Sequence, residues 1–394
     1  MGRSLISLQH LTYVLIFCGL TFGADPVLAD SKQTPLTATP TYEALPGYKA
    51  SAVYTADPNT PYTVHSLQNK LAAANMALRT CEQAHPTFNN QAHCELVRVD
   101  DTTITSSATL KERVPSTAHP LYLWRYQSSV ATVYLAGSVH ILKQGLYPLA
   151  KPYQEAFDAS QTLVLEIDIS ALTPQELQAK SMQYATLAGP SGLSEILPMP
   201  MYQRFAAAAA DYGLPLPQLE RFKPAFLTQQ LSVLAMLALG YDPEQGVEKH
   251  FMQQLGGREV LELESIDFQL DLLLNQPLET QLAILEDTLN QLSELEVLTA
   301  DLMTAWLSGD DPAFARLFEL QSGSSDAVKA FMEALMDERN VGMADKIAGY
   351  LQTPGSYFVL VGSGHFVGND NVIELLKHKG LEGTRIYSNQ TLGQ

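Results

Sequence analysis

The chain has 394 residues, of which 46% are hydrophobic and 17% are charged, a composition typical of a globular protein with a substantial core. Its formal net charge of −18 argues against a nucleic-acid partner, because phosphate binding needs clustered Lys and Arg, and the sequence has no such block. An acidic surplus is compatible with binding cations or basic substrates.

Residues 1–29 have the features of a signal peptide. Arg3 precedes an apolar run over residues 11–23, and Val27 and Ala29 occupy the positions expected before a cleavage site. The run is shorter than the roughly 20 residues of a membrane span. We therefore expect export to the periplasm or the cell exterior, with no membrane span once the signal is removed.

Residues 30–60 are rich in Thr, Pro, Ala and Ser without periodicity, which predicts a flexible linker. Residues 61–118 are expected to form a small N-terminal segment. Helical spacing over 64–80 is followed there by a cysteine-containing loop and a strand pattern, "ELVRVDDTTIT".

Cys81 and Cys94 flank that loop. In an exported protein an even pair of cysteines favours a disulfide bond. A zinc site with His85 and His93 from the same loop is the alternative, and we favour the disulfide.

Residues 119–390 are expected to form the main domain. It opens with a hairpin ("LYLWRYQ" and "ATVYLAG"), and the pattern strand, helix, strand through "PLAKPYQEAFDAS" and "TLVLEIDI" predicts a βαβ unit with parallel strands. Mostly helical sequence follows over 173–255, then a short strand ("REVLELES") and further amphipathic helices to about 351. A strand ("SYFVLVGSGH"), a helix and an edge strand ("TRIYS") close the chain.

The predicted fold class is therefore α/β. We expect a mainly parallel sheet built from two related strand-GxxH halves, with a large helical insertion between them and a small disulfide-stapled N-terminal segment.

Two histidines follow buried strands in matching contexts. His140 ends "YLAGSVH" and His365 ends "VLVGSGH", so each comes after a Gly-Ser pair at a strand end. Glu166 ends the apolar run of "TLVLE", and ligand sites form where the carboxyl ends of parallel strands meet. Two imidazoles and a carboxylate suit a divalent metal of the Mn, Co or Zn type, which would activate water.

Three further polar residues are candidates for supporting this site. Ser138 and Ser363 each stand beside a motif histidine, and Glu264 could reach the same edge from another strand. A nucleophilic serine is the rival chemistry. The Gly-x-Ser-x-Gly elbow of the α/β-hydrolases does not fit, however, because each Ser directly follows its Gly.

Six ordered blocks resemble the TraB/GumN family, which is related to the Tiki metalloproteases that cleave Wnt proteins. They are "VYLAGSVHIL…LYPL", "TLVLEID", "YDPEQGVEKHF", "LELESIDFQLDLL", "DERNVGMADKI" and "YFVLVGSGHFVGNDNVIELLKHKG", and together they cover about residues 119–388. The N-terminal segment lies outside the resemblance.

The resemblance implies metal-dependent hydrolysis of a peptide or protein substrate. It places the family's two histidines on His140 and His365, its acid on Glu166 and its arginine on Arg339. Arg339 would face the open side of the site and hold a carboxylate or oxyanion. In "QGVEKHF" many relatives have Asp where this chain has Glu248, so the role of that position stays open.

Two hypotheses remain from the sequence. The first is an exported metal-dependent hydrolase that uses His140, Glu166, Arg339 and His365, and the resemblance implies that it cleaves peptide bonds. The second is a non-catalytic protein that holds a metal or a haem-like ligand at the same edge, for which Tyr134 and Tyr147 are candidate ligand contacts. His250 is expected to be structural.

Overall fold

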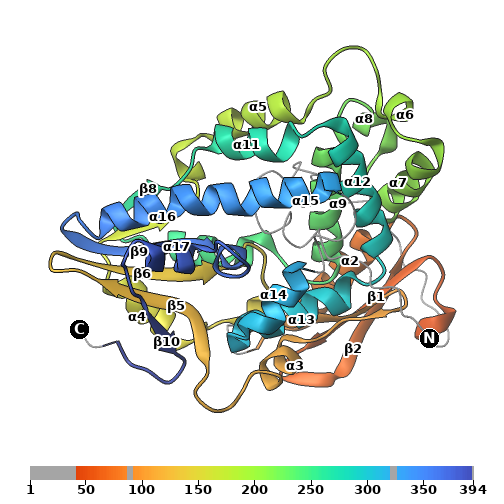
Figure 1. Cartoon of the computed structure of the whole chain (residues 1–394). Coiled ribbons are helices and arrows are strands. Elements are labelled where there is room, and N and C mark those ends of the chain that lie inside the picture. Colours follow the sequence, from red (N-terminus) through yellow and green to blue (C-terminus); the bar gives the residue numbers. More distant parts are fainter. Residues whose placement is uncertain (1–40, 87–91, 320–325, 393–394) are drawn as a thin grey trace, which may run out of the picture.

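The computed structural model describes residues 41–86, 92–319 and 326–392 (Figure 1). The predicted signal peptide and the first part of the predicted linker lie outside these residues. Within the described part of the chain, no helix combines the length and the hydropathy that crossing a membrane requires.

A six-stranded mixed sheet forms the centre of the main domain, in the order β10-β5-β6-β9-β7-β8. The strands are β5 (Pro120–Gln127), β6 (Ala131–Ser138), β7 (Thr162–Leu165), β8 (Glu259–Glu262), β9 (Gly355–Gly362) and β10 (Thr384–Tyr387). The predicted hairpin is confirmed, because β5 and β6 pair antiparallel. β6, β9, β7 and β8 pair in parallel, and β10 closes the edge antiparallel to β5.

A second sheet corrects two of the predictions. β1 (Tyr48–Tyr54), β2 (Asp57–Ser66), β3 (Cys94–Val99) and β4 (Thr102–Thr103) form an antiparallel sheet in the order β2-β1-β3-β4. Residues 48–60 of the predicted linker therefore belong to β1, the turn after it and the start of β2. The prediction of a mainly parallel sheet is also wrong, because this whole sheet and one side of the larger sheet are antiparallel.

The strands β6 and β9 that carry the Gly-Ser motifs are neighbours, with Ser138 opposite Gly362. The structure does not show two related halves built around them. β9 instead lies between β6 and β7. The insertion helices, with β8 among them, lie in sequence between β7 and β9.

Helices cover the sheets and fill the insertion (Figure 1). Those of the N-terminal segment and the first crossover are α2 (Lys70–Ala84), α3 (Ser107–Glu112) and α4 (Lys151–Asp158). Those of the insertion are α5 (Pro174–Ala185), α6 (Leu193–Ile196), α7 (Met199–Asp211), α8 (Leu216–Leu219), α9 (Pro224–Ala238), α10 (Val247–Met252), α11 (Ile266–Leu274), α12 (Leu278–Gln291), α13 (Leu295–Ser308), α14 (Asp311–Glu319) and α15 (Asp326–Glu333). The last two are α16 (Arg339–Tyr350) and α17 (Val372–His378).

The N-terminal segment is part of the main core rather than a separate unit. Ala52 of β1 and Ala77 of α2 belong to the same buried cluster as Leu135 of β6 and Val359 of β9. A second core holds the insertion together and includes Phe205. The segment thus supports the main domain directly.

Cys81 and Cys94 are paired as a disulfide that joins α2 to the start of β3. The two histidines of the zinc alternative have other partners. His85 stacks on Tyr54 with ring centroids 3.9 Å apart, and His93 Nε2 lies 2.8 Å from the Oε1 atom of Glu95. These contacts agree with the disulfide, which leaves neither Cys81 nor Cys94 a free thiol for a metal.

Candidate functional site

Three neighbouring strands bring His140, Glu166 and His365 to one edge of the sheet. Glu166 directly follows β7, and the two histidines follow β6 and β9 by two or three residues. The strand ends lie so close together that a side chain at Gly137 would have no space. A Cβ atom on Gly137 would lie 2.7 Å from the Oγ atom of Ser363 and 2.8 Å from the Cβ atom of Tyr122. Glycine at this position therefore lets β6 and the turn after β9 approach each other.

The three side chains meet beside the backbone of Gly362. A Cβ atom on this residue would lie 3.1 Å from Glu166 Oε1, 3.6 Å from His140 Nε2 and 3.9 Å from His365 Cδ2. Both imidazoles thus approach one point. They are closer together than the roughly 10 Å beyond which one ion with ligand distances near 2 Å could not reach both.

His365 is buried and neutral. Its Nδ1 atom lies 2.6 Å from Asn340 Oδ1, while Asn340 Nδ2 donates to the carbonyl oxygen of Asp370 at 3.1 Å. The amide orientation is fixed by that second bond, so Nδ1 carries the proton and donates it to Asn340. Burial and, next, the charge of Arg339 lower the pKa of His365 to about 3. Its Nε2 atom keeps a free lone pair, 3.9 Å from Glu166 Oε1.

His140 is held in the same manner by a carboxylate. Its Nδ1 atom lies 2.7 Å from Glu248 Oε1, an oxygen that also accepts a short hydrogen bond from the Ser138 hydroxyl. Burial alone would lower the pKa of His140, but the charge and hydrogen bond of Glu248 raise it overall. The Nε2 atom is buried and has no hydrogen-bond partner. An unpartnered buried nitrogen of this kind calls for an explanation, such as a proton acceptor role or a ligand.

Glu166 is a buried carboxylate whose charge is stabilised by its neighbours. Its Oε2 atom accepts from Arg339 at 2.5 Å and from Gln269 Nε2 at 3.3 Å, and its Oε1 atom accepts from the Gly362 N–H at 2.5 Å. Burial would raise its pKa, but Arg339 and then the two histidines lower the pKa to about 2. The charge therefore persists across the physiological range.

Arg339 lies behind Glu166 and not on the open side of the site. Its side chain is completely buried between Glu166 and Glu264, and its Nε atom donates to Glu264 at 2.9 and 3.0 Å. A π-helical turn over Ala334–Glu338 precedes it and is followed by α16. The expectation that Arg339 faces the open side is therefore wrong, because the guanidinium is buried. The groups that it holds are two carboxylates of the protein itself.

The supporting residues predicted from sequence have defined places. Ser138 donates to Glu248, Ser363 Oγ donates to the Ser138 carbonyl oxygen at 3.0 Å, and Glu264 pairs with Arg339. The two hydroxyls are thus bonded to other groups, and neither donates to a histidine.

Sequence reasoning missed two polar contacts of this site, Asn340 and Gln269, and left the role of Glu248 open. Asn340 directly follows the arginine in "ERN" and is 2% exposed in the structure. The sequence shows a polar residue within an amphipathic helix, but it does not show that this residue is buried. His250 is structural as expected, since it stacks on Tyr147 with ring centroids 4.5 Å apart.

Two imidazoles and a carboxylate are suitable ligand types for a divalent metal. The three side chains are not, however, spaced as they would be around a bound ion. Within residues 41–86, 92–319 and 326–392, no three His, Cys, Asp or Glu side chains are grouped so as to hold an ion. Each imidazole nevertheless donates Nδ1–H to a protein oxygen and keeps Nε2 available, which is the arrangement usual for metal-binding histidines.

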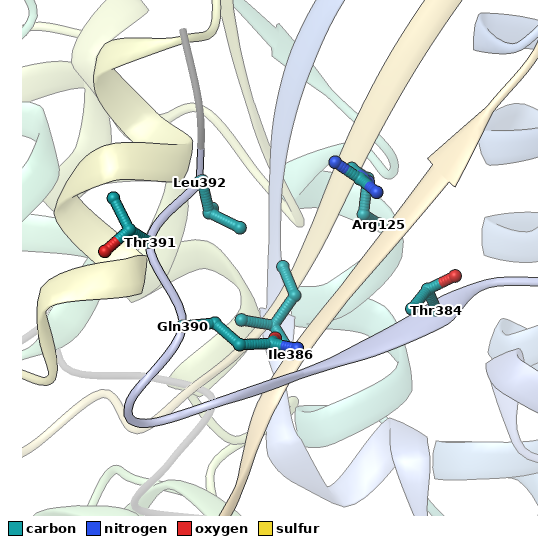
Figure 2. A pocket seen from close by; sticks show the side chains of 6 residues that line it. All are labelled: Arg125, Thr384, Ile386, Gln390, Thr391 and Leu392. Carbon is teal, nitrogen blue, oxygen red and sulfur yellow. The ribbon is translucent and has the colours of Figure 1, made fainter.

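Two pockets lie outside this cluster. Figure 2 shows one of about 180 Å³, which is lined by Arg125, Thr384, Ile386, Gln390, Thr391 and Leu392 and contains none of the site residues. The other, of about 350 Å³, includes Phe366, the residue after His365. Phe366 packs edge-on against Trp124, with ring centroids 5.2 Å apart.

Comparison with known proteins assigns the sequence that carries this site to a family. The chain is 26% identical over 253 residues to an uncharacterized protein named YbaP from Escherichia coli (strain K12), covering 62% of this chain and 87% of the relative. The YbaP of Shigella flexneri gives the same values, and an uncharacterized protein of Treponema pallidum (strain Nichols) is 22% identical over 274 residues, covering 66% of this chain and 80% of that protein. No solved structure matches the chain. Residues 122–385, which carry both motif histidines, Glu166 and Arg339, match the TraB/PrgY/gumN family, and the chain belongs to it.

Proposed function

We propose that this chain is an exported metal-dependent hydrolase of peptide bonds, in which His140, Glu166 and His365 hold a divalent ion of the Mn, Co or Zn type. The observation that carries the proposal is the pair of buried Nε2 atoms. Each belongs to an imidazole whose Nδ1–H is already donated to the protein, and both lie beside the ionised Glu166.

The protein's own groups prepare this donor set. Glu248 and Asn340 fix the ring orientation and tautomer of His140 and His365, respectively. Arg339 and the Gly362 N–H keep Glu166 anionic and fixed in place. When bound, a divalent metal would supply Lewis acidity and lower the pKa of a bound water molecule.

The roles of the two charged residues follow from the pKa of Glu166 and from the burial of Arg339. A carboxyl group with a pKa of about 2 has no proton to donate near neutral pH, so Glu166 serves as an anionic ligand and not as a general acid. Arg339 cannot touch a substrate, because its side chain is completely buried. We assign it as a positioning residue that orients Glu166.

The competing hypotheses find less support. A serine nucleophile would need a hydroxyl that donates to a histidine, whereas Ser138 donates to Glu248 and Ser363 to a carbonyl oxygen. For a haem-like ligand, Tyr147 donates its hydroxyl to the Gln245 carbonyl oxygen, and Tyr134 is 6% exposed within β6. Neither tyrosine is presented as an axial ligand. The disulfide supports export, since such bonds persist in oxidising compartments.

Metal analysis of the purified mature protein tests the proposal. The expected result is about one equivalent of a divalent transition metal in the wild type, with hydrolysis of a mixed peptide substrate that a chelator abolishes and the metal restores. His140→Ala and His365→Ala should lose both. His378→Ala is the matched control, because that histidine is exposed at the end of α17.

Three results would distinguish the alternatives. Metal content without hydrolysis in any peptide mixture would favour the non-catalytic binding protein. Hydrolysis that survives complete metal removal would reject the metal mechanism. Equal metal content in the wild type and in both site variants would reject the ligand assignment.

A further inference from the structure

The loop that carries His140 contacts the N-terminal segment, which lies outside the family match. We use "His140 loop" for residues 139–147. The N-terminal segment, predicted over residues 61–118, is extended here to the described residues 41–86 and 92–118, because β1 belongs to its sheet. The family match begins at residue 122, so the partner of this loop is an addition to the family domain in this chain. The contact consists of buried polar groups on both sides.

Gly145 is the closest point of this contact. A Cβ atom on Gly145 would lie 2.6 Å from both His93 Nε2 and Ser107 Oγ, and nearer still to Glu95 Oε1. His93, Glu95 and Ser107 are all at most 9% exposed. Glu95 ties the three together, because it accepts from the Ser107 N–H at 3.1 Å and lies 2.8 Å from His93. The loop backbone therefore rests on a fixed polar surface with no room for a side chain.

Two lysines join the same elements from opposite directions. Lys143 of the His140 loop is 4% exposed, and its Nζ atom donates to the Thr105 carbonyl oxygen at 2.7 Å. From the N-terminal segment, Lys111 Nζ donates to the Tyr147 carbonyl oxygen at 3.3 Å. Thr105 is itself anchored, because its N–H donates to Glu296 of α13 at 2.6 Å.

The His140 loop also holds the helix that supplies Glu248. Leu142 pairs with Asp242 through two backbone hydrogen bonds, and the Val247 N–H donates to the Val139 carbonyl oxygen at 3.0 Å. Gly246 packs its backbone against the His140 carbonyl group. His140, its loop and the start of α10 are thus joined by backbone contacts, and the N-terminal segment contacts this joined unit.

We propose that the N-terminal segment positions the His140–Glu248 pair through its contact with the His140 loop, and that Glu95 and Gly145 are the positioning residues. Only the expected effect on turnover rests on the proposed function. The ordering of the loop itself can be measured whether or not the protein is a hydrolase.

The test uses the full mature protein with Gly145→Ala, which inserts a methyl group at the contact without a backbone penalty from φ. Gly349→Ala is the matched control, because a Cβ atom there has no neighbour within 4 Å. Glu95→Gln is the second variant and keeps the shape of the side chain if Gly145→Ala fails to fold. Hydrogen exchange followed by mass spectrometry reports on peptides covering 139–147 and 242–252.

Gly145→Ala should accelerate exchange in both peptides and leave the insertion helices α5–α8 unchanged. Its kcat should fall about 10–100-fold with KM within about twofold, the range found for residues that orient metal ligands. Glu95→Gln should give the same pattern at smaller amplitude, and Gly349→Ala should match the wild type.

Unchanged exchange in residues 139–147 in either variant would overturn the proposal, and so would exchange that rises uniformly over the chain. A changed KM with an unchanged kcat would overturn the positioning role. A wild type with neither metal nor hydrolysis would reject the proposed function alone, because the exchange result would still decide whether the segment orders the loop.

Discussion

Gly362→Ala should place a methyl group within the candidate site while leaving the fold intact. The Cβ position at this residue is 3.1 Å from Glu166 Oε1 and 3.6 Å from His140 Nε2, so the new methyl group would stand among the proposed ligands. The backbone at Gly362 has a φ of −51°, which any residue can adopt. The effect is therefore steric and confined to the site.

The magnitude follows from the contact distances. A 3.1 Å approach is tighter than ordinary van der Waals contact, and relieving it by small shifts should cost about 1–3 kcal/mol of unfolding free energy. Ligand bonds to a transition metal are near 2 Å, so a displaced carboxylate and a methyl group beside His140 should weaken metal affinity at least about 100-fold, equivalent to about 2.8 kcal/mol.

Two measurements separate these effects. Urea unfolding gives the stability change, and calorimetric titration of the metal-free protein with Zn²⁺ or Mn²⁺ gives the affinity. Gly349→Ala provides the same substitution in open space. Wild-type metal affinity and stoichiometry in Gly362→Ala would refute the assignment of this point as the metal position.

Three further outcomes are expected. Arg339→Ala should lower the unfolding free energy by about 3–5 kcal/mol in urea melts, because it leaves the buried Glu166 carboxylate without its cation; a loss below about 1 kcal/mol would contradict this. Replacing Cys81 and Cys94 together by Ser should cost about 3 kcal/mol for a cross-link between residues 13 apart, and equal thermal melts would show that the bond does not form. The carboxyl of Glu95 has its pKa lowered from 4.5 to about 2, so it stabilises the fold above pH 4.5 by up to about 3 kcal/mol and loses this contribution as pH falls toward 2. The stability gap between wild type and Glu95→Gln should therefore shrink over that window, and a gap independent of pH would count against a charged Glu95.

The sequence was informative where apolar runs end at polar residues. Such runs predicted β6, β7 and β9, and the parallel arrangement of their ends brings His140, Glu166 and His365 together. The predictive information here is local, because it lies in the strand and in the few residues that follow it.

Strand β2 was missed for a physical reason. It contains Pro58 and Pro61, which read as linker, but β2 pairs only with β1 at the edge of its sheet. An edge strand needs no hydrogen bond from every N–H group, so proline is tolerated there. Composition alone cannot distinguish such a strand from a flexible segment.

The burial of Arg339 was equally beyond the reach of sequence. Its nearest acids in the chain are Asp337 and Glu338, whereas its partners are Glu166 and Glu264, from strand ends far away in sequence. A charge selects its partner through tertiary packing. The contacts of Asn340 with His365 and of Glu248 with His140 also join residues that are not neighbours in the sequence.

The position of β9 determines when the six-stranded sheet can be completed during folding. β9 is an interior strand, yet it follows its neighbours β6 and β7 by the whole helical insertion. Pairing across so long a separation is slow, and until it occurs the edges of β6 and β7 stay open to pairing with other chains. Because Gly362 and His365 arrive with this strand, closing the sheet and assembling the candidate site are the same late event. A nascent or partly folded chain would therefore carry no assembled site, and the folding step most exposed to aggregation is also the one that completes it.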